Sequence, residues 1–347
     1  MLAELLKLVP LIRRDIDVEY LHYEDVHTPQ AIDAALEAAE LDGGWVLGVN
    51  LQIEVQWELS LALARWCARH SVPLYNYVQD YWPHHRESLR VLTTDCGVRL
   101  VGSSPFIIDS LGKDGFEAGF LPMGAQIPAF VPPRDPSSPN VVASVGRLIS
   151  RKRFPDIARA FCVAGLDKSS QLWLTLIRSH VFRTEEDQLQ LQLIRNEISK
   201  PGVDSNSIRL GLTPVVPPDY SRVTVYVSAS DYEGFSMPPY EAAYCGCPPV
   251  LSDIPPHKAM ARAVFGKQAE DFLYPVTDTD ALAKLLQDEI STGRRRRYIE
   301  ENQIQIRQVI ATNYSLNTTA NALVRLCTES NGFAQSSPEQ GMHPGAG

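Results

Sequence analysis

The chain has 347 residues, of which 44% are hydrophobic and 21% are charged, so it can form the cores of about two domains and is not a disordered, collagen-like or coiled-coil protein. Its 32 basic and 41 acidic side chains leave a net charge of −9, which disfavours a protein that binds along a nucleic-acid backbone. No apolar run reaches the roughly 18 residues of a membrane-spanning helix, and the N-terminus lacks the small-residue cleavage site of a secretory signal. We expect a cytoplasmic protein without a transmembrane segment; the sequence leaves its oligomeric state open.

Short apolar runs alternate with segments of helical periodicity, which is the pattern of parallel sheets covered by helices. In the first half, strands are expected at Asp17–Tyr23, Trp45–Val49, Leu74–Val78, Arg99–Gly102 and Glu117–Leu121, and helices at Thr28–Glu40, Glu54–His70, Arg86–Asp95 and Pro105–Leu111. In the second half, strands are expected at Val141–Val145, Leu172–Ile177, Ile208–Leu210, Val223–Val227 and Pro249–Leu251, and helices at Phe154–Ala164, Glu185–Ser199, Pro238–Cys245, Thr279–Glu289, Arg294–Ile310 and Leu316–Cys327.

A proline-rich stretch, IPAFVPPRDPSSPN at residues 127–140, separates the two halves. Proline removes backbone donors and favours extended conformations, so this stretch reads as a linker. We therefore predict an N-terminal domain over residues 1–135, a hinge at 127–140 within the boundary and a C-terminal domain over 140–312. A closing helix at 313–328 is expected to pack back on the N-terminal domain, and the tail over 329–347 is expected to be disordered.

The segment from Val225 to His257 carries most of the chemical information. A hydrophobic strand leads to Glu233, a short loop follows, and Pro238 and Pro239 suit the first turn of a helix. Glu241 is expected in that first turn. A carboxylate can hold the two adjacent hydroxyls of a ribose, and the free amides of a helix N-terminus can hold an anion. The segment therefore predicts a site for a phosphorylated, hydroxyl-bearing ligand.

This segment resembles the retaining glycosyltransferases of family 4, which have the GT-B fold: two Rossmann-like α/β domains facing each other across a cleft. The donor domain of that family carries two glutamates separated by seven residues, and Glu233 and Glu241 have this spacing. A second segment, Gly146-Arg147-Leu148-Ile149-Ser150-Arg151-Lys152, is similar to the family's Gly-Arg-Leu segment with a lysine five residues after the arginine. The similarity spans Asn140 to about Cys327 and extends more weakly back to about Asp17.

The resemblance implies a retaining, metal-independent transferase that moves a hexose-type sugar from a nucleoside diphosphate sugar, UDP- or GDP-linked, to an acceptor that the sequence does not identify. It implies that Glu241 binds the ribose, that Glu233 binds a hydroxyl of the transferred sugar, and that Arg147 and Lys152 stabilise the charge growing on the leaving diphosphate. Two cations can replace a divalent metal, so no cofactor is expected. The implied donor-binding residues are Gly146, Arg147, Lys152, Glu233, Gly234, Phe235, Ser236, Met237 and Glu241.

In the N-terminal half, YNYVQDYWP takes the place of the family's strand that ends in His-Asp. Asp80 matches, and Gln79 stands where the family often has histidine, so an acid or base role at this position is not expected. Gln79, Asp80, Tyr81 and His84 are the candidates for contact with the acceptor or the sugar. The family's first strand and glycine-rich loop have no counterpart here, so the N-terminal domain is expected to be reduced. This departure leaves a second hypothesis, a non-catalytic GT-B protein that binds a nucleotide sugar or stabilises a partner, and a third, a GT-B epimerase.

Other patterns have structural interpretations. Asp278 and Asp280 form an Asp-x-Asp directly before a helix, which favours helix capping over metal binding. The run Arg294–Arg297 is expected on a solvated helix face, and Thr213–Pro218 is expected to read the donor base. The six cysteines lack zinc-site spacing and are expected to be free thiols.

Overall fold

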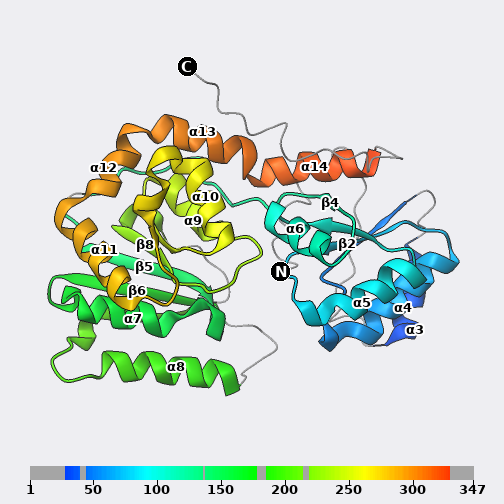
Figure 1. Ribbon diagram of the computed structural model, residues 1–347, viewed down its shortest axis with the longest axis horizontal. Coiled ribbons are helices and arrows are strands. Elements are labelled where there is room, and N and C mark those ends of the chain that lie inside the picture. Colours follow the sequence, from blue (N-terminus) through cyan, green and yellow to red (C-terminus); the bar gives the residue numbers. More distant parts are fainter. Residues whose placement is uncertain (1–27, 40–43, 136, 178–184, 214–218, 329–347) are drawn as a thin grey trace. The chain divides into compact units, whose positions relative to one another are not determined.

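The computed structural model describes residues 28–39, 44–135, 137–177, 185–213 and 219–328. The expected strand Asp17–Tyr23, most of the expected base-reading loop and the tail over 329–347 lie outside these ranges. The chain divides into two compact units (Figure 1). Unit 1 combines the described residues up to Gly124 with the C-terminal helix α14 (Leu316–Thr328), and unit 2 is Ala125–Ser315.

Unit 1 is built on a parallel four-stranded sheet in the order β1-β2-β3-β4. Its strands are β1 (Val46–Val49), β2 (Leu74–Val78), β3 (Arg99–Gly102) and β4 (Ala118–Phe120), and its helices besides α14 are α3 (Pro29–Ala38), α4 (Trp57–Arg69), α5 (Arg86–Arg90) and α6 (Pro105–Lys113). Successive side chains of a strand point to opposite faces of the sheet. Leu74 and Val78 accordingly join a core with α3, α4 and α6, whereas Tyr75 and Tyr77 join a second core with α14.

The described residues of unit 2 form a parallel six-stranded sheet in the order β10-β9-β8-β5-β6-β7. The strands are β5 (Asn140–Arg147), β6 (Ser170–Ile177), β7 (Ile208–Thr213), β8 (Val225–Ser228), β9 (Pro249–Ser252) and β10 (Leu273–Tyr274). The helices are α7 (Phe154–Val163), α8 (Glu185–Ile198), α9 (Met237–Tyr244), α10 (Pro255–Phe265), α11 (Thr279–Thr292), α12 (Arg294–Glu301) and α13 (Gln303–Asn313).

The alternation along β5 separates the two cores of unit 2. Val141, Ala143 and Val145 pack in one core with residues of α9, α10 and α13, and Val142 packs in the other with residues of α7, α8 and α11. Figure 1 shows α7 and α8 on one face of this sheet and α9, α10 and α13 on the other. Because both faces are covered, the strands are apolar on both sides, as expected of a parallel sheet.

The strand order of unit 2 determines where a ligand can bind. From β5 the chain adds β6 and β7 on one side of the sheet and then β8, β9 and β10 on the other. The order therefore reverses between β5 and β8, and in open α/β sheets the crevice outside the carboxyl ends of the strands at such a point is where ligands bind. The loops that follow Arg147 and Ser228 lie at this point.

The structure divides the chain earlier than the predicted boundary at residues 135–140, between Gly124 and Ala125. The proline-rich stretch belongs to unit 2, where Arg134 Nη2 donates to the carbonyl oxygens of Ser138 and Pro139, each at 3.1 Å, and to Thr224 Oγ1 at 3.2 Å. The chain returns to unit 1 after Ser315, and Ala125 and Ser315 form a parallel bridge. The residues at which the chain enters and leaves unit 2 therefore lie side by side.

Three other elements differ from the sequence-based expectations. The expected helix Arg294–Ile310 is interrupted at Asn302, which separates α12 from α13. The short strand β10 and the helix α10 were not predicted. The start of α10 has a sequence signal, because prolines are favoured in the first turn of a helix, where the missing amide hydrogen has no helical partner.

We expect Asp278→Ala to lower the free energy of unfolding by about 1 kcal/mol, because the Asp278 side chain accepts the Ala281 N–H at 2.9 Å and caps α11. Asp280→Ala is the matched control, since Asp280 lies inside the helix and its exposed carboxylate contributes only through the helix dipole. Chemical denaturation measures both variants. A larger loss for Asp280→Ala than for Asp278→Ala would contradict the capping role.

Candidate functional site

Two loops meet at the carboxyl ends of β5 and β8. The first contains the 3₁₀ turn Ser150–Lys152 and the second runs from Ala229 to Ser236. The Asp231 N–H donates to the Arg151 carbonyl oxygen at 3.0 Å, and the Arg151 guanidinium lies 5.5 Å from the centre of the Tyr232 ring. These contacts hold the two loops together beside the point where the strand order reverses.

An ion pair joins the same two loops. Lys152 Nζ donates to Glu233 Oε1, and Ser230 Oγ donates to the same oxygen at 2.6 Å. Burial opposes ionisation of Glu233, but the positive charges of Lys152 and Arg151 and the two hydrogen bonds outweigh it and hold the pKa of this carboxyl below its ordinary value. Among the described residues both donors contact Oε1, which leaves Oε2 to accept a hydrogen bond from a ligand hydroxyl.

Gly146, the glycine of the predicted Gly-Arg-Leu segment, makes room for this pair. A Cβ at position 146 would lie 3.4 Å from Cδ and Cε of Lys152 and 3.5 Å from the Phe154 ring. A methyl group at this position would be in van der Waals contact with the lysine stem, so a larger side chain would have to compete with that stem for space on its path to Glu233.

Arg153 follows the lysine, and its backbone is in the left-handed region, with φ 51° and ψ 38°. Residues other than glycine adopt this conformation at a cost of about 1 kcal/mol or more. The side chain is held by Asp156, whose Oδ2 accepts from Arg153 Nε at 2.6 Å, and by Asp231 at 3.7 Å. These two carboxylates offset the strained backbone and add another contact between the loops.

Arg147, unlike Lys152, does not pair with Glu233. Its side chain is exposed, and its positive charge contributes, after hydrogen bonds from Ser150, to lowering the pKa of Glu186. The Ser150 N–H donates to Glu186 Oε1 at 2.8 Å. The two cations predicted from the sequence therefore differ in environment: Lys152 is largely buried against Glu233, whereas Arg147 lies at the surface near a carboxylate of α8.

Glu241 lies in the second turn of α9 and not in the first, because the helix begins at Met237. The side chain is only 8% exposed. It accepts the Gln126 N–H at 3.2 Å on Oε1 and the Tyr220 hydroxyl at 3.4 Å on Oε2. Both carboxylate oxygens of Glu241 therefore act as hydrogen-bond acceptors in this structure.

The N-terminus of α9 offers fewer donors than an ordinary helix, because Pro238 and Pro239 have no amide hydrogen. The amides available at this helix start belong to Ser236 and Met237, and Ser236 is buried and makes no side-chain capping bond. Phe235 stacks on Tyr240 with ring centres 5.1 Å apart, which fixes the loop ahead of the helix. Gly234, the remaining predicted donor-binding residue, is buried in this loop.

The four candidates in unit 1 follow the carboxyl end of β2. The Gln79 N–H donates to Asn50 Oδ1 at 2.7 Å, and the Asp80 carbonyl oxygen accepts from Gln52 Nε2 at 3.0 Å. Tyr81 is 6% exposed and donates to Asp114, which also pairs with Arg86 at 2.6 Å. The structure thus gives Tyr81 a role in holding the loop, and His84 is the exposed member of the set.

The sequence did not single out the buried amides Asn50 and Gln52 in unit 1. Asn50 has a left-handed backbone, φ 52°, and Gln52 Oε1 accepts from Asn76 Nδ2 at 3.0 Å. Polar residues directly after a strand were the available signal. In unit 2 the missed residues are Ser230, Ser252 and His257, which lie behind Glu233; their polar side chains also follow or end neighbouring strands.

His257 is fully buried in the first turn of α10. Its Nδ1 lies 2.9 Å from the Ser252 carbonyl oxygen and 3.1 Å from Ser252 Oγ. Burial lowers the pKa of His257 to about 4, although the charge of Glu233 acts in the opposite direction. The imidazole is therefore neutral at pH 7.

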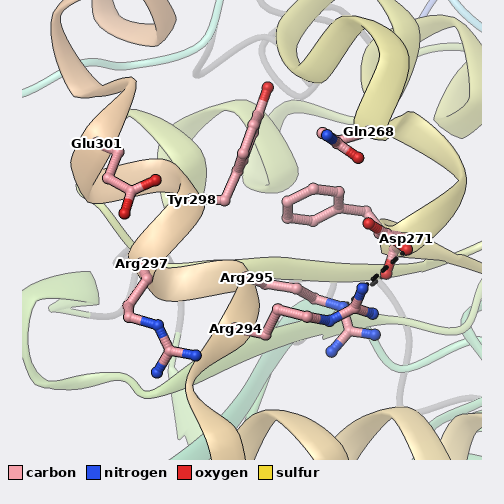
Figure 2. A pocket seen from close by; sticks show the side chains of 8 residues that line it. Gln268, Asp271, Arg294, Arg295, Arg297, Tyr298 and Glu301 are labelled. Atoms are coloured by element: carbon pink, nitrogen blue, oxygen red, sulfur yellow. Dashed lines mark hydrogen bonds and ion pairs between the residues drawn. The ribbon is translucent and has the colours of Figure 1, made fainter.

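A separate cavity of about 320 Å³ lies beside α12 (Figure 2) and is lined by Gln268, Asp271, Phe272, Arg294, Arg295, Arg297, Tyr298 and Glu301. Arg294 pairs with Asp271 at 3.2 Å, and Arg295, only 1% exposed, pairs with Asp288 at 2.9 Å. Arg296 Nη2 donates to the Thr224 carbonyl oxygen at 2.8 Å. The expectation of a solvated face is therefore wrong for Arg295 and Arg296, whose charges fasten α12 to the domain.

The described residues contain no group of three or more His, Cys, Asp or Glu side chains placed to hold a metal ion. In the same part of the chain no helix has the length and apolar character needed to cross a membrane. Cys67, Cys96, Cys162, Cys245 and Cys247 are free thiols, as predicted.

The sequence matches the family described as "Glycosyl transferases group 1" over residues 130–305, just over half of the chain. A comparison with curated proteins gives no significant match.

Solved structures share the fold at low sequence identity. Anabaena HepE in complex with UDP and glucose is 17% identical, with 86% of this chain and 81% of that chain covered and a TM-score of 0.67. Sucrose-phosphate synthase from Thermosynechococcus elongatus is 17% identical, with 88% and 79% covered and a TM-score of 0.65. The pneumococcal O-GlcNAc transferase GtfA in complex with UDP and GlcNAc is 15% identical, with 85% and 59% covered and a TM-score of 0.62. The likeness confirms the predicted GT-B fold.

We expect His257 to make the protein less stable at acid pH. The unfolded chain protonates this imidazole near pH 6.5, whereas the folded chain does so near pH 4. Between these values the unfolded state binds more protons, so the free energy of unfolding falls as the pH falls, by about 2 kcal/mol from this group between pH 7 and pH 5.

Denaturant unfolding of wild type and His257→Phe at pH 7, 6 and 5 tests this expectation. The variant should lose less stability over the range than wild type, while His84→Phe, at an exposed position, should keep the wild-type slope. Parallel slopes for wild type and His257→Phe would show that the buried imidazole does not set the acid limit.

Proposed function

The chain belongs to the group 1 glycosyl transferases, and we propose that it transfers a hexose from a nucleoside diphosphate sugar to an acceptor, with retention of anomeric configuration and without a metal ion. The observation that carries this proposal is the Lys152–Glu233 ion pair, which lies beside the carboxyl ends of β5 and β8, where the strand order reverses. The pair provides an ionised carboxylate that can accept hydrogen bonds from sugar hydroxyls and an ammonium group that can bind phosphate.

Each part of the donor has a matching group in unit 2. The Glu241 carboxylate accepts the two ribose hydroxyls, the amides of Ser236 and Met237 contact the phosphates, and Glu233 Oε2 accepts a hydroxyl of the sugar. UDP is the first nucleotide to test, because the HepE and GtfA structures contain UDP. Lys152 and the more exposed Arg147 supply positive charge to the diphosphate.

In the reaction, the bond between the sugar C1 and the phosphate oxygen breaks and its electron pair stays on the diphosphate. The acceptor hydroxyl oxygen forms the new bond to C1, and its proton passes to the departing diphosphate oxygen. A cation aimed at the leaving oxygen lowers the barrier by a few kcal/mol. Glu233 Oε1 already accepts from Lys152 and Ser230, which reduces its nucleophilicity and favours retention without a covalent sugar–Glu233 intermediate.

Calorimetry and thermal shift with UDP-, GDP-, ADP- and TDP-sugars, with and without EDTA, test the proposal. We expect one nucleotide series to bind and to raise the melting temperature equally with and without EDTA. Glu241→Gln should weaken that binding, because the amide has lost one acceptor oxygen and the charge. Absence of binding by every donor would indicate a non-catalytic protein, and binding that requires a divalent metal would overturn the metal-free mechanism.

We expect Lys152→Met to reduce turnover by about 100-fold or more, because it removes the buried cation at the leaving group. The same change leaves Glu233 buried without its cation, which costs about 3 to 5 kcal/mol of stability. The double variant Lys152→Met/Glu233→Gln removes both charges and should recover much of the stability while staying inactive.

Arg147→Ala should show a smaller loss of turnover, since Arg147 is exposed and shares its charge with Glu186. Combined with Lys152→Met, it should abolish turnover. Near-normal activity in that combined variant would mean that another group neutralises the leaving diphosphate.

A further inference from the structure

Behind Glu233 lies a row of buried serine hydroxyls that the donor-binding groups do not include. Ser228, Ser230 and Ser252 are 5%, 1% and 0% exposed. Ser228 Oγ lies 3.4 Å from Ser230 Oγ, and Ser252 Oγ donates to the Ser230 carbonyl oxygen. Ser252, the last residue of β9, therefore holds the backbone of the residue whose own hydroxyl donates to Glu233 Oε1.

His257 stands at the far end of this row. Its Nδ1 is within hydrogen-bond distance of the Ser252 carbonyl oxygen, at 2.9 Å, and a carbonyl oxygen can only accept. The proton of the neutral imidazole is therefore on Nδ1. The same N–H lies 3.1 Å from Ser252 Oγ, which can accept from it while donating its own proton to Ser230.

The donors of this row all point toward the carboxylate. The order runs from His257 Nδ1–H to Ser252, from the Ser252 hydroxyl to the Ser230 carbonyl, and from the Ser230 hydroxyl to Glu233 Oε1. The first two bonds share the Ser252 hydroxyl and reinforce each other, and at Ser230 the held backbone fixes the position from which the hydroxyl donates. A carboxylate held by such a row keeps one orientation.

The row of hydroxyls is important because the Lys152 ammonium can pair with two anions, the Glu233 carboxylate and the diphosphate of a bound donor. In the absence of ligand its ammonium contacts Glu233 Oε1, and a bound diphosphate competes for the same charge. Ser230 is then the neutral donor that still holds Oε1, so that Oε2 keeps its direction toward the sugar. Such preorganisation is what a site needs to recognise a hydroxyl at a defined position.

We propose that His257 is a positioning residue for recognition of the donor sugar: through Ser252 and Ser230 it fixes the orientation of the Glu233 carboxylate. The inference rests on the proposed function of Glu233 as the acceptor for a sugar hydroxyl. It assigns to His257 no contact with the nucleotide, so its effect is confined to the sugar half of the donor.

The experiment compares the binding of UDP with that of UDP-glucose by calorimetry, or the equivalent pair for the nucleotide that the donor screen identifies. In His257→Phe, which keeps a ring but removes the N–H, we expect affinity for UDP-glucose to fall by about tenfold and affinity for UDP to stay unchanged. His257→Asn places an amide N–H near the position of Nδ1 and should restore most of the lost affinity. His70→Phe, at an exposed histidine outside the predicted site, is the control.

Ser230→Ala provides an independent test if His257→Phe does not fold, because it removes only the final hydroxyl of the row. It should cause the same selective loss for UDP-glucose. Equal weakening of UDP and UDP-glucose in these variants, or no weakening of either, would overturn the role of the row and leave the proposed function intact. Failure of wild type to bind any nucleotide sugar would instead overturn the proposed function and this inference with it.

Discussion

A buried ammonium–carboxylate pair, Lys152 with Glu233, is the interaction on which the site depends. It joins the loop after β5 to the loop after β8, the two strands between which the order of the unit 2 sheet reverses. An ion pair of this kind is held by the surrounding hydrogen bonds as much as by charge, since both groups lose water on burial. The hydroxyl of Ser230 donates to the carboxylate, and Arg151 adds a second positive charge. Gly146 leaves space for the lysine stem.

The layers on both faces of the sheet keep the pair in place. Residues of β5 alternate between a core with α9, α10 and α13 and a core with α7, α8 and α11, so neither face of the strand can shift without disturbing packed side chains. Glu241 is placed by α9 on the first of these faces, and its partner Gln126 follows the bridge between Ala125 and Ser315. The second acidic residue of the site is thus tied to the segment where the chain enters unit 2.

Several polar side chains buried behind the site form hydrogen bonds with one another and with the backbone. His257 Nδ1 bonds to Ser252, and Ser252 Oγ bonds to the backbone of the Ser230 loop. In unit 1 the side chains of Asn50, Gln52 and Asn76 bond to one another and to the loop that carries Gln79 and Asp80. A buried polar group without a partner costs about as much free energy as a lost hydrogen bond. Both networks therefore specify one loop conformation at the end of a strand.

The sequence by itself determined the fold class, most strands and the candidate carboxylates, because these depend on local periodicity and on motif spacing. β2 and β3 have the predicted bounds, Leu74–Val78 and Arg99–Gly102, and Asp278 caps its helix as predicted.

Tertiary structure decided the features that depend on partners distant in the chain. It brought Lys152 and not Arg147 onto Glu233, fastened the proline-rich stretch to unit 2 through Arg134, buried Arg295, and placed His257 behind the site. Periodicity records only which face of an element is apolar, whereas these outcomes follow from which strands become neighbours in the sheet and which charges they bring together.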